Sequence, residues 1–273
     1  MKLYLHSYSR TSKSAKSLAK ALGATFIWSG EAHKLLSDPN EKTIVINWGS
    51  SANNFTSSDL LWINSPINTN VATSKIQTYE ILKENNIPTC EFTKNRGEAL
   101  NWLYNLSSVY TRYKNRSSGG KGILYHSPNQ IDEFLQQTPA LFYTKEITIA
   151  DEYRVHIFEQ KNTHNFFVQK KIKKENWVAN YGHIPYSSHI SSHDNGYIFV
   201  STTFDQNSPA YDNLKDTCIK ALKALKLNFG AFDVKYSREN GQGVILECNT
   251  APGLFPKTLN FYQDSISTYV HNA

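Results

Sequence analysis

A hairpin pattern near the C-terminus places three oxygen ligands close together. The stretch from Phe229 to Leu254 puts Asp233 on one short strand and Glu247 and Asn249 on the next. Alternation along the second strand sends Glu247 and Asn249 to the same face. If Asp233 pairs opposite Glu247, two like charges face each other, which destabilises a sheet unless a cation lies between them. Magnesium fits this carboxylate and amide set best, because it also keeps room for phosphate oxygens. The alternative is a solvated hairpin face with a polar turn at Arg238 to Gln242.

The size and composition of the chain limit its class. A chain of 273 residues can bury a substantial core, as one large domain or as two to three small lobes. Hydrophobic residues make up 40% and charged residues 19%, which excludes a disordered chain. The first residues turn polar too early for a secretory signal, and no apolar run approaches membrane-spanning length. Cys90, Cys218 and Cys248 are scattered and suit reduced thiols. We therefore expect a cytoplasmic protein with no membrane partner.

The basic charge leaves the partner open. Lys+Arg 29 against Asp+Glu 23 gives a net charge of +6 and a pI of about 9.0. This excess is compatible with a polyanion, but ATP and an acidic small substrate account for it equally well. The aromatic residues alternate as strand core residues and form no stacking platform, so nucleic acid is not indicated.

Hydrophobic periodicity predicts an α+β chain that begins with a small α/β unit. Its first part alternates β-rich runs with a helical pattern at Ser14 to Leu22, which indicates parallel strands. A polar connection follows at 64–73, and a helix is expected at Lys75 to Asn85. The remainder is mainly antiparallel. Further helices are expected at Glu98–Leu106, Asn129–Gln137, Pro209–Leu225 and Leu259–Val270.

A glycine-rich loop, SSGGKG at Ser117 to Gly122, joins two of the predicted strands. Successive backbone amides in such a loop can wrap phosphate oxygens, since glycine permits unusual dihedrals and close approach. The loop is not a Walker A motif, because Asn115 replaces the first glycine and Gly122 stands where Ser or Thr would bind magnesium. An ordinary flexible turn is the alternative interpretation.

The order of these signals resembles the ATP-grasp superfamily over about residues 66 to 262. DVKYSRENGQGVILECNTAPGL matches the family's Asp…Glu-x-Asn signature with its Thr-x-Pro-Gly turn, as in D-alanine:D-alanine ligase. The block EYRVHIF, with INWG upstream and NGYIFV downstream, is similar to an ATP-grasp group common in tailed bacteriophages. The resemblance implies three lobes with ATP bound between two α+β lobes. These are an α/β lobe at 1–65, a central lobe with a glycine lid at 66–145 and a C-terminal lobe with the metal site at 146–273.

The resemblance also implies an ATP site. Lys75 falls at the family's first ATP-contacting lysine, and Arg112 at the second, where arginine keeps the charge and offers a planar fork. Gly119, Gly120, Lys121 and Gly122 resemble the lid over the triphosphate. The hinge that reads adenine would be Thr144–Ile147, which includes Lys145, Glu146 and Ile147, with Glu152 on the ribose hydroxyls. Either Lys170 or Lys171 matches the lysine that reaches back to the phosphates.

Some of these residues have structural alternatives. Lys75 could be a solvated helix residue, and Glu152 could pair with Arg154 at a strand start. By alternation Glu152, Arg154 and His156 share one face, and we expect this row to lie over a cleft.

The metal set implied by the resemblance is Asp233, Glu247 and Asn249, holding two Mg²⁺ ions for which Mn²⁺ can substitute. One departure concerns catalysis. D-alanine:D-alanine ligase has an arginine two residues before the metal aspartate, and this chain has Ala231 there. Arg154 is therefore the leading candidate to stabilise the oxyanion, and Lys171 is the second catalytic candidate, although Lys170 is not excluded.

The implied function is an ATP- and Mg²⁺-dependent carboxylate–amine ligase that forms an acyl phosphate and then an amide. Its partners would be a small-molecule or peptide substrate with a carboxylate and an amine co-substrate. One alternative is an ATP-grasp phosphotransferase acting on a hydroxyl, which the missing arginine favours. The other is a non-catalytic nucleotide-binding module, which the intact metal positions disfavour.

Overall fold

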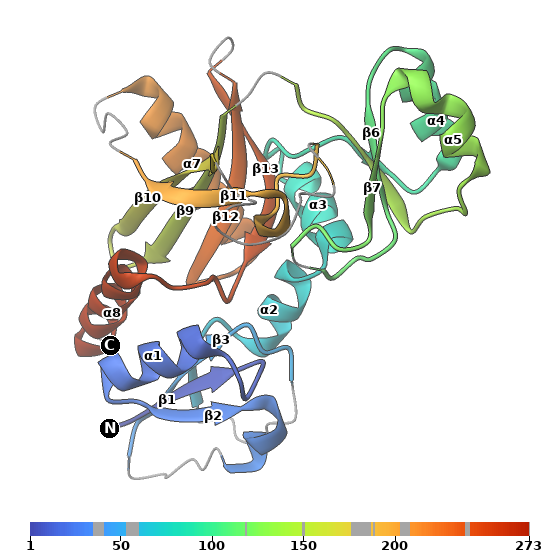
Figure 1. Cartoon of the computed structure of the whole chain (residues 1–273). Helices are drawn as coiled ribbons and strands as arrows, with labels where there is room; N and C mark the ends of the chain where they lie inside the picture. The colour runs from blue at the N-terminus through green and yellow to red at the C-terminus, as the bar shows by residue number, and fades with distance from the viewer. Residues whose placement is uncertain are drawn as a thin grey trace.

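The computed structural model describes residues 1–34, 41–52, 60–117, 119–148, 151–175, 187, 189–202, 208–237 and 241–272. Ser118, most of the loop between Trp177 and Asn195, and residues 238–240 of the expected turn lie outside these residues. The described strands form three sheets, which lie in separate parts of the molecule, one at the bottom, one at the upper left and one at the upper right of Figure 1. An α+β fold is therefore confirmed.

The N-terminal unit is a parallel sheet with strand order β2-β1-β3-β4. Its elements are β1 (Lys2–Ser7), α1 (Lys13–Leu22), β2 (Thr25–Trp28), the 3-10 helix η1 (Ser29–Lys34), β3 (Thr43–Trp48) and β4 (Leu60–Ile63). Strand β3 is buried along its whole length, as expected for an apolar strand covered on both faces. Helix α1 starts at the cap Ser12, whose side chain accepts from the Ala15 N–H, and ends at Gly23 in the left-handed region.

The connection expected at 64–73 is wrong, because this segment contains helix α2 (Pro66–Ala72). Ser65 caps the helix by accepting from the Asn68 N–H, and Pro66 takes the first helical position, where its missing N–H costs nothing. The polar composition of the segment predicts a connection, although Ser65 and Pro66 are a helix start signal. Helix α3 (Lys75–Glu84) follows directly, with Ser74 as its cap, and confirms the helix expected there.

The central sheet has strand order β5-β8-β6-β7 and is antiparallel. Its elements are β5 (Phe92–Thr93), α4 (Arg96–Tyr104), β6 (Val109–Arg112), β7 (Ile123–His126), the 3-10 helix η2 (Pro128–Gln130), α5 (Ile131–Gln136) and β8 (Phe142–Lys145). Helices α4 and α5 pack on one face around the buried Phe134 and Tyr143. Figure 1 shows both helices on the side of β6 and β7 that lies away from the rest of the molecule. The opposite face therefore remains for a binding site.

The C-terminal sheet has strand order β11-β10-β9-β12-β13 and is antiparallel throughout, as expected. Its elements are β9 (Asp151–Glu159), β10 (His164–Lys173), the 3-10 helix η3 (His193–Asn195), β11 (Tyr197–Ser201), α7 (Pro209–Ala224), β12 (Phe229–Ser237) and β13 (Gln242–Asn249). Helix α7 and helices α2 and α3 cover one face, where Tyr153, Val155 and Ile157 alternate into the core. The residues between them, such as Arg154, point to the other face.

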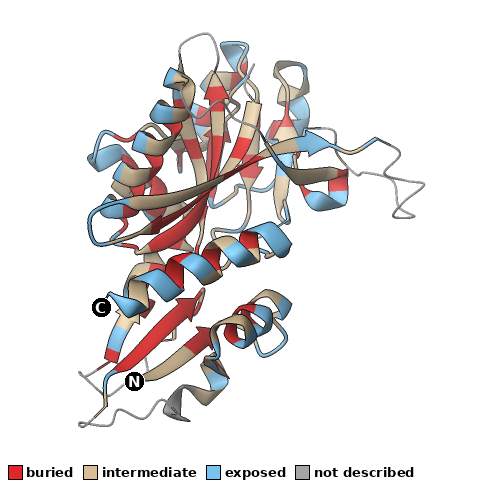
Figure 2. Cartoon of the chain, turned by 90° about the vertical axis from the view of Figure 1, so that its left-hand side faces the viewer, coloured by how far each residue is buried: buried red, intermediate tan, exposed pale blue. Residues whose placement is uncertain are grey.

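Helix α8 (Pro256–His271) joins the C-terminal sheet to the N-terminal unit. Its buried stripe is visible in Figure 2, and it includes Tyr262. The Tyr262 ring meets Trp48 of β3 edge-on at 5.1 Å, and Trp48 also stacks on Phe229 of β12 at 5.3 Å. The two units therefore share one hydrophobic core.

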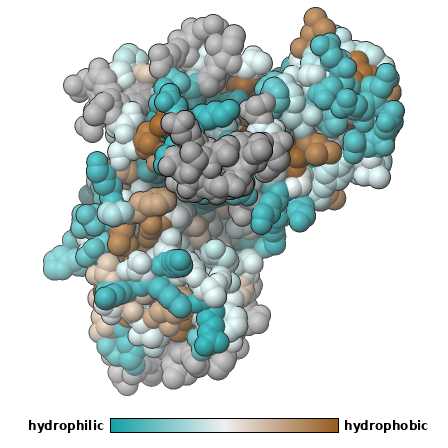
Figure 3. Space-filling model, viewed as in Figure 1, coloured by the Kyte–Doolittle hydropathy of each residue, from teal (hydrophilic) through white to brown (hydrophobic). Residues whose placement is uncertain are grey.

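No helix in the described part of the chain is long and apolar enough to cross a membrane. On the face shown in Figure 3 hydrophilic side chains (teal) predominate, and the hydrophobic residues (brown) lie in small groups.

Candidate active site

A cavity of about 990 Å³ lies between the central and the C-terminal sheets. This volume suits a small-molecule ligand. Most of the residues predicted from the sequence line it: Lys75, Arg112, Gly119, Gly120, Lys145, Ile147, Glu152, Arg154, Lys171, Asp233, Glu247 and Asn249. Lys121, Gly122, Glu146 and Lys170 are not among the lining residues.

The β12–β13 hairpin brings the two predicted carboxylates together. Asp233 pairs directly opposite Glu247, and a register shift follows between Asp233 and Val234. Asp233 is 4% exposed and lines the cavity, so it forms a buried part of the cavity wall. Asn249 follows on the same face and donates from Nδ2 to Glu247 Oε1 at 3.1 Å.

Arg154 of β9 is the first cation beside these carboxylates. It lies opposite Asp233 in the β9–β12 pairing and binds it with a planar fork, Nε to Oδ1 at 2.6 Å and Nη2 to Oδ2 at 2.8 Å. The Phe199 ring covers the guanidinium, with its centroid 3.9 Å away. Burial lowers the pKa of Arg154, but Asp233, Glu247 and Glu152 together outweigh burial and raise it. Arg154 therefore stays charged.

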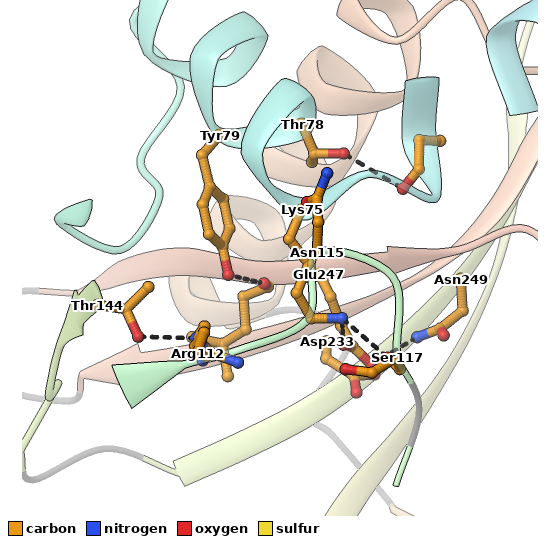
Figure 4. Close-up of polar contacts among 12 residues, drawn as sticks. Lys75, Thr78, Tyr79, Arg112, Asn115, Ser117, Thr144, Asp233, Glu247 and Asn249 are labelled. Atoms are coloured by element: carbon orange, nitrogen blue, oxygen red, sulfur yellow. Dashed lines mark hydrogen bonds and ion pairs between the residues drawn. The ribbon is translucent and has the colours of Figure 1, made fainter. Parts of the chain in front are cut away.

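Lys75 is the second cation, and it comes from the first turn of α3. Its Nζ lies 2.9 Å from Glu247 Oε2 and donates to the Ser117 carbonyl at 3.2 Å (Figure 4). Burial raises the pKa of Glu247, but Lys75 and Arg154 outweigh burial and hold it well below its usual range. The cation that the sequence requires between the carboxylates is thus supplied by two protein side chains.

The oxygen donors suit a hard divalent cation. Two carboxylates and one amide on adjacent strands form the donor type that Mg²⁺ takes, usually together with phosphate oxygens. Within the described ranges, no group of three or more His, Cys, Asp or Glu side chains is placed to hold a metal ion. A magnesium site here therefore depends on Asn249 or on ligand oxygens in addition to Asp233 and Glu247.

The structure distinguishes the two neighbouring lysines. Lys171 lines the cavity and forms an ion pair with Glu152, whereas Lys170 faces the opposite side of β10 and pairs with Asp151 at 2.8 Å. Burial raises the pKa of Glu152, and Lys171 opposes this shift. Lys171, and not Arg154, is thus the partner of Glu152, so the alternative pairing is wrong.

The row of three ionisable residues expected over the cleft contains only two. His156 shares the face of Glu152 and Arg154, but it is fully buried beneath α8. Its ring bonds Tyr262 and Gln169. Burial lowers the pKa of His156 to about 3, so the ring is neutral near pH 7.

The glycine loop has the backbone that its sequence requires. Gly119, Gly120 and Gly122 have φ values of 68°, 76° and 74°, in the left-handed region that favours glycine. Asn115 ties the start of the loop to α3, since its Oδ1 accepts from the Ile76 N–H at 3.0 Å. The loop therefore begins at the same helix end that carries Lys75.

The hinge segment has one side toward the cavity. Lys145 and Ile147 line it, whereas Glu146 accepts from the Tyr110 and Tyr125 hydroxyls at 3.3 and 3.2 Å. Arg112 donates from Nε to Thr144 Oγ1 at 3.0 Å, which holds its guanidinium beside the hinge.

Sequence reasoning missed several lining residues. Lys235 lies on the face of Asp233 and donates to the Ile147 carbonyl at 2.7 Å. Period-2 alternation from Asp233 would have found it. Phe199 and Gln169 reach the cavity through strand pairing alone, and no local signal marks them.

Comparisons with known proteins support the fold. No protein-family model matches the sequence, and no curated protein matches it. D-alanyl-alanine synthetase A from Vibrio cholerae O1 is similar in structure, with a TM-score of 0.70 and 14% identity over 99% of this chain and 98% of that chain.

Two similar structures contain a bound precursor. The ATP-grasp ligase PsnB complexed with minimal precursor, Mg and ADP has a TM-score of 0.63 and 12% identity, covering 98% of this chain and 97% of that one. The macrocyclase MdnC from Microcystis aeruginosa, bound to precursor peptide MdnA, has a TM-score of 0.61 and 11% identity over 100% of both chains. The chain therefore has the ATP-grasp fold. The resemblance to the ATP-grasp superfamily is confirmed at the level of the fold.

Proposed function

We propose that the chain is an ATP- and Mg²⁺-dependent carboxylate–amine ligase. The observation that carries the proposal is one cavity lined by cations and by a magnesium-type donor set. Lys75, Arg112 and Lys171 supply positive charge opposite Asp233 and Glu247. Phosphoryl transfer depends on this combination, since its catalysis is mostly positioning and charge stabilisation. The PsnB structure, which holds Mg and ADP, supports the same cofactors here.

The side chains that line the cavity divide the first step of the proposed reaction between them. Lys75, Arg112 and Lys171 hold the triphosphate, and Gly119 and Gly120 of the glycine loop, which line the cavity, exclude water. A substrate carboxylate oxygen attacks the γ-phosphorus, the bond from the γ-phosphorus to the bridging oxygen breaks, and ADP leaves with that electron pair. When bound, two Mg²⁺ ions held by the hairpin would neutralise phosphate charge. The product of this step is an acyl phosphate.

An amine completes the reaction. Its nitrogen attacks the acyl carbon, the bond from that carbon to the phosphate oxygen breaks, and inorganic phosphate leaves as the nitrogen loses a proton to solvent. Ala231 offers no charge to the oxyanion of this step. Arg154, from the neighbouring strand, reaches the carboxylate of Asp233 and supplies the charge in its place.

The substrates proposed are a small molecule or peptide with a carboxylate, and an amine. D-alanyl-alanine synthetase A and the precursor-bound PsnB and MdnC support this range. We also propose the lobes at 1–65, 66–145 and 146–273, with ATP between the second and third.

Hydroxylamine trapping tests the ligase. Wild-type protein is incubated with ATP, MgCl₂, hydroxylamine and a panel of acids that contains acetate, succinate, L-glutamate, D-alanine and short peptides. A hydroxamate from one acid, absent with Asp233→Asn, supports the acyl phosphate. The competing phosphotransferase rests on Ala231, and it predicts no hydroxamate with any acid and an ATP-dependent phosphate ester on an alcohol.

A further inference from the structure

Gln169 of β10 occupies a part of the cavity wall that the proposed reaction does not yet use. It pairs with Arg154 of β9 on one side and with Ser201 of β11 on the other. Gln169 is only 7% exposed, yet it lines the cavity. Strands lie about 4.8 Å apart, so Arg154 is one strand and Gln169 two strands from Asp233. Gln169 therefore lies beyond Arg154 as seen from the metal donors.

A buried chain of hydrogen bonds holds the Gln169 side chain. Its Oε1 lies 2.9 Å from His156 Nε2, and His156 Nδ1 lies 3.1 Å from the Tyr262 hydroxyl. Both His156 and Tyr262 are fully buried, with Trp48 and Phe229 packed against the tyrosine ring. A buried side chain with these bonds has little freedom to rotate.

Only one direction of donation satisfies all three side chains in this series of hydrogen bonds. His156 is neutral, so one ring nitrogen donates and the other accepts. The buried Tyr262 hydroxyl needs an acceptor, and His156 Nδ1 provides it. His156 Nε2 then carries the proton and donates to Gln169 Oε1. The Gln169 oxygen is thereby fixed toward His156, and its NH₂ group is turned to the cavity as a donor.

We propose that Gln169 binds the substrate carboxylate together with Arg154, and that His156 and Tyr262 are positioning residues that keep its NH₂ toward the substrate. This inference rests on the proposed ligase function and deepens it. An NH₂ group beside a guanidinium presents only donors, so this part of the cavity accepts an anionic or carbonyl oxygen and rejects an ammonium group. The carboxylate to be activated therefore enters here, and the amine must approach from another side.

The sharpest test is Gln169→Glu. Glutamate keeps an acceptor toward His156 Nε2 and replaces the NH₂ donor by an anionic oxygen of the same shape. The assay uses the acid that gives a hydroxamate with wild-type protein. We expect the KM for that acid to rise by about 10- to 100-fold, the range of one hydrogen bond to a charged group, while the KM for ATP stays unchanged. Gln137→Glu, at an exposed position at the end of α5, is the matched control and should behave as wild type.

Tyr262→Phe tests the positioning role. Without the hydroxyl, His156 Nδ1 loses its donor. The direction of donation along the hydrogen bonds from Tyr262 to Gln169 is then no longer fixed. The KM for the acid should rise several-fold, by less than in Gln169→Glu, with kcat and the KM for ATP preserved. A purely structural role of Tyr262 would lower the melting temperature and leave the KM for the acid of the folded enzyme unchanged. Tyr104→Phe, at an exposed tyrosine, is the control.

Each outcome decides the inference. A wild-type KM for the acid in Gln169→Glu overturns it, while the hydroxamate assay leaves the ligase standing. An equal rise in the KM for ATP also overturns it, because Gln169 would then act on the nucleotide or on the fold. If wild-type protein forms no hydroxamate with any acid, the ligase proposal fails first and this inference fails with it.

Discussion

Removal of Arg154 should destabilise the metal-free protein. The Asp233 side chain is 5% exposed, and in Arg154→Ala it loses both bonds of the guanidinium fork. Asp233 then faces Glu247 across the hairpin, and Lys75 stays paired with Glu247. Breaking a buried ion pair by removing one partner costs about 3–5 kcal/mol. We expect a loss near the lower end, about 3 kcal/mol, because the Arg154 side chain is 17% exposed and Lys75 stays in place.

Urea unfolding followed by tryptophan fluorescence in EDTA measures this loss. Arg10→Ala removes the same charge at an exposed site and should change the free energy of unfolding by less than about 0.5 kcal/mol. Mg²⁺ should then stabilise Arg154→Ala more than wild type, since the ion no longer competes with the guanidinium for Asp233. A free energy of unfolding within about 1 kcal/mol of wild type in EDTA would refute the assigned role of the Arg154–Asp233 pair. Equal stabilisation of both proteins by Mg²⁺ would refute the competition.

Three further predictions concern nucleotide binding and pH. Lys171→Met should weaken binding of a non-hydrolysable ATP analogue by about 10-fold or more in calorimetry. Lys170→Met, on the other face of β10, should bind the analogue as wild type. Equal losses would contradict the placement of the two lysines on opposite faces of β10. The pKa of Glu247 is depressed in the folded state, because Lys75 and Arg154 outweigh burial. The ionised Glu247 therefore stabilises the fold above the unfolded pKa of about 4.3, and this stabilisation is lost as pH falls below that value. Glu247→Gln should therefore flatten the decline of unfolding free energy below about pH 5, and an unchanged slope would contradict the ion pair. Burial lowers the pKa of His156 from about 6.5 to about 3, so the unfolded chain takes the proton first and stability falls as pH drops from 6.5 toward 3. His156→Gln should reduce the difference between urea curves at pH 7 and pH 5, and a full wild-type difference would show that His156 is not the group responsible.

Local patterns predicted much of the site. The spacing of Asp233, Glu247 and Asn249 along two adjacent strands is enough to place them on one face, because strand alternation and a short turn act within a few residues. The glycine positions in the loop are likewise a local feature. Local patterns failed at 64–73, where the polar composition predicts a connection although Ser65 and Pro66 begin a helix.

The sequence by itself determined which side chains share a face of each strand, because the period of two is a property of the extended backbone. Only the tertiary structure decided which face looks into the cavity, and so it separated Lys171 from Lys170. It also decided that Arg154 meets Asp233, a contact between residues 79 positions apart that depends on β9 lying beside β12. Strand order is fixed by the packing of whole sheets and helices around shared cores, and no short segment of the chain carries that information.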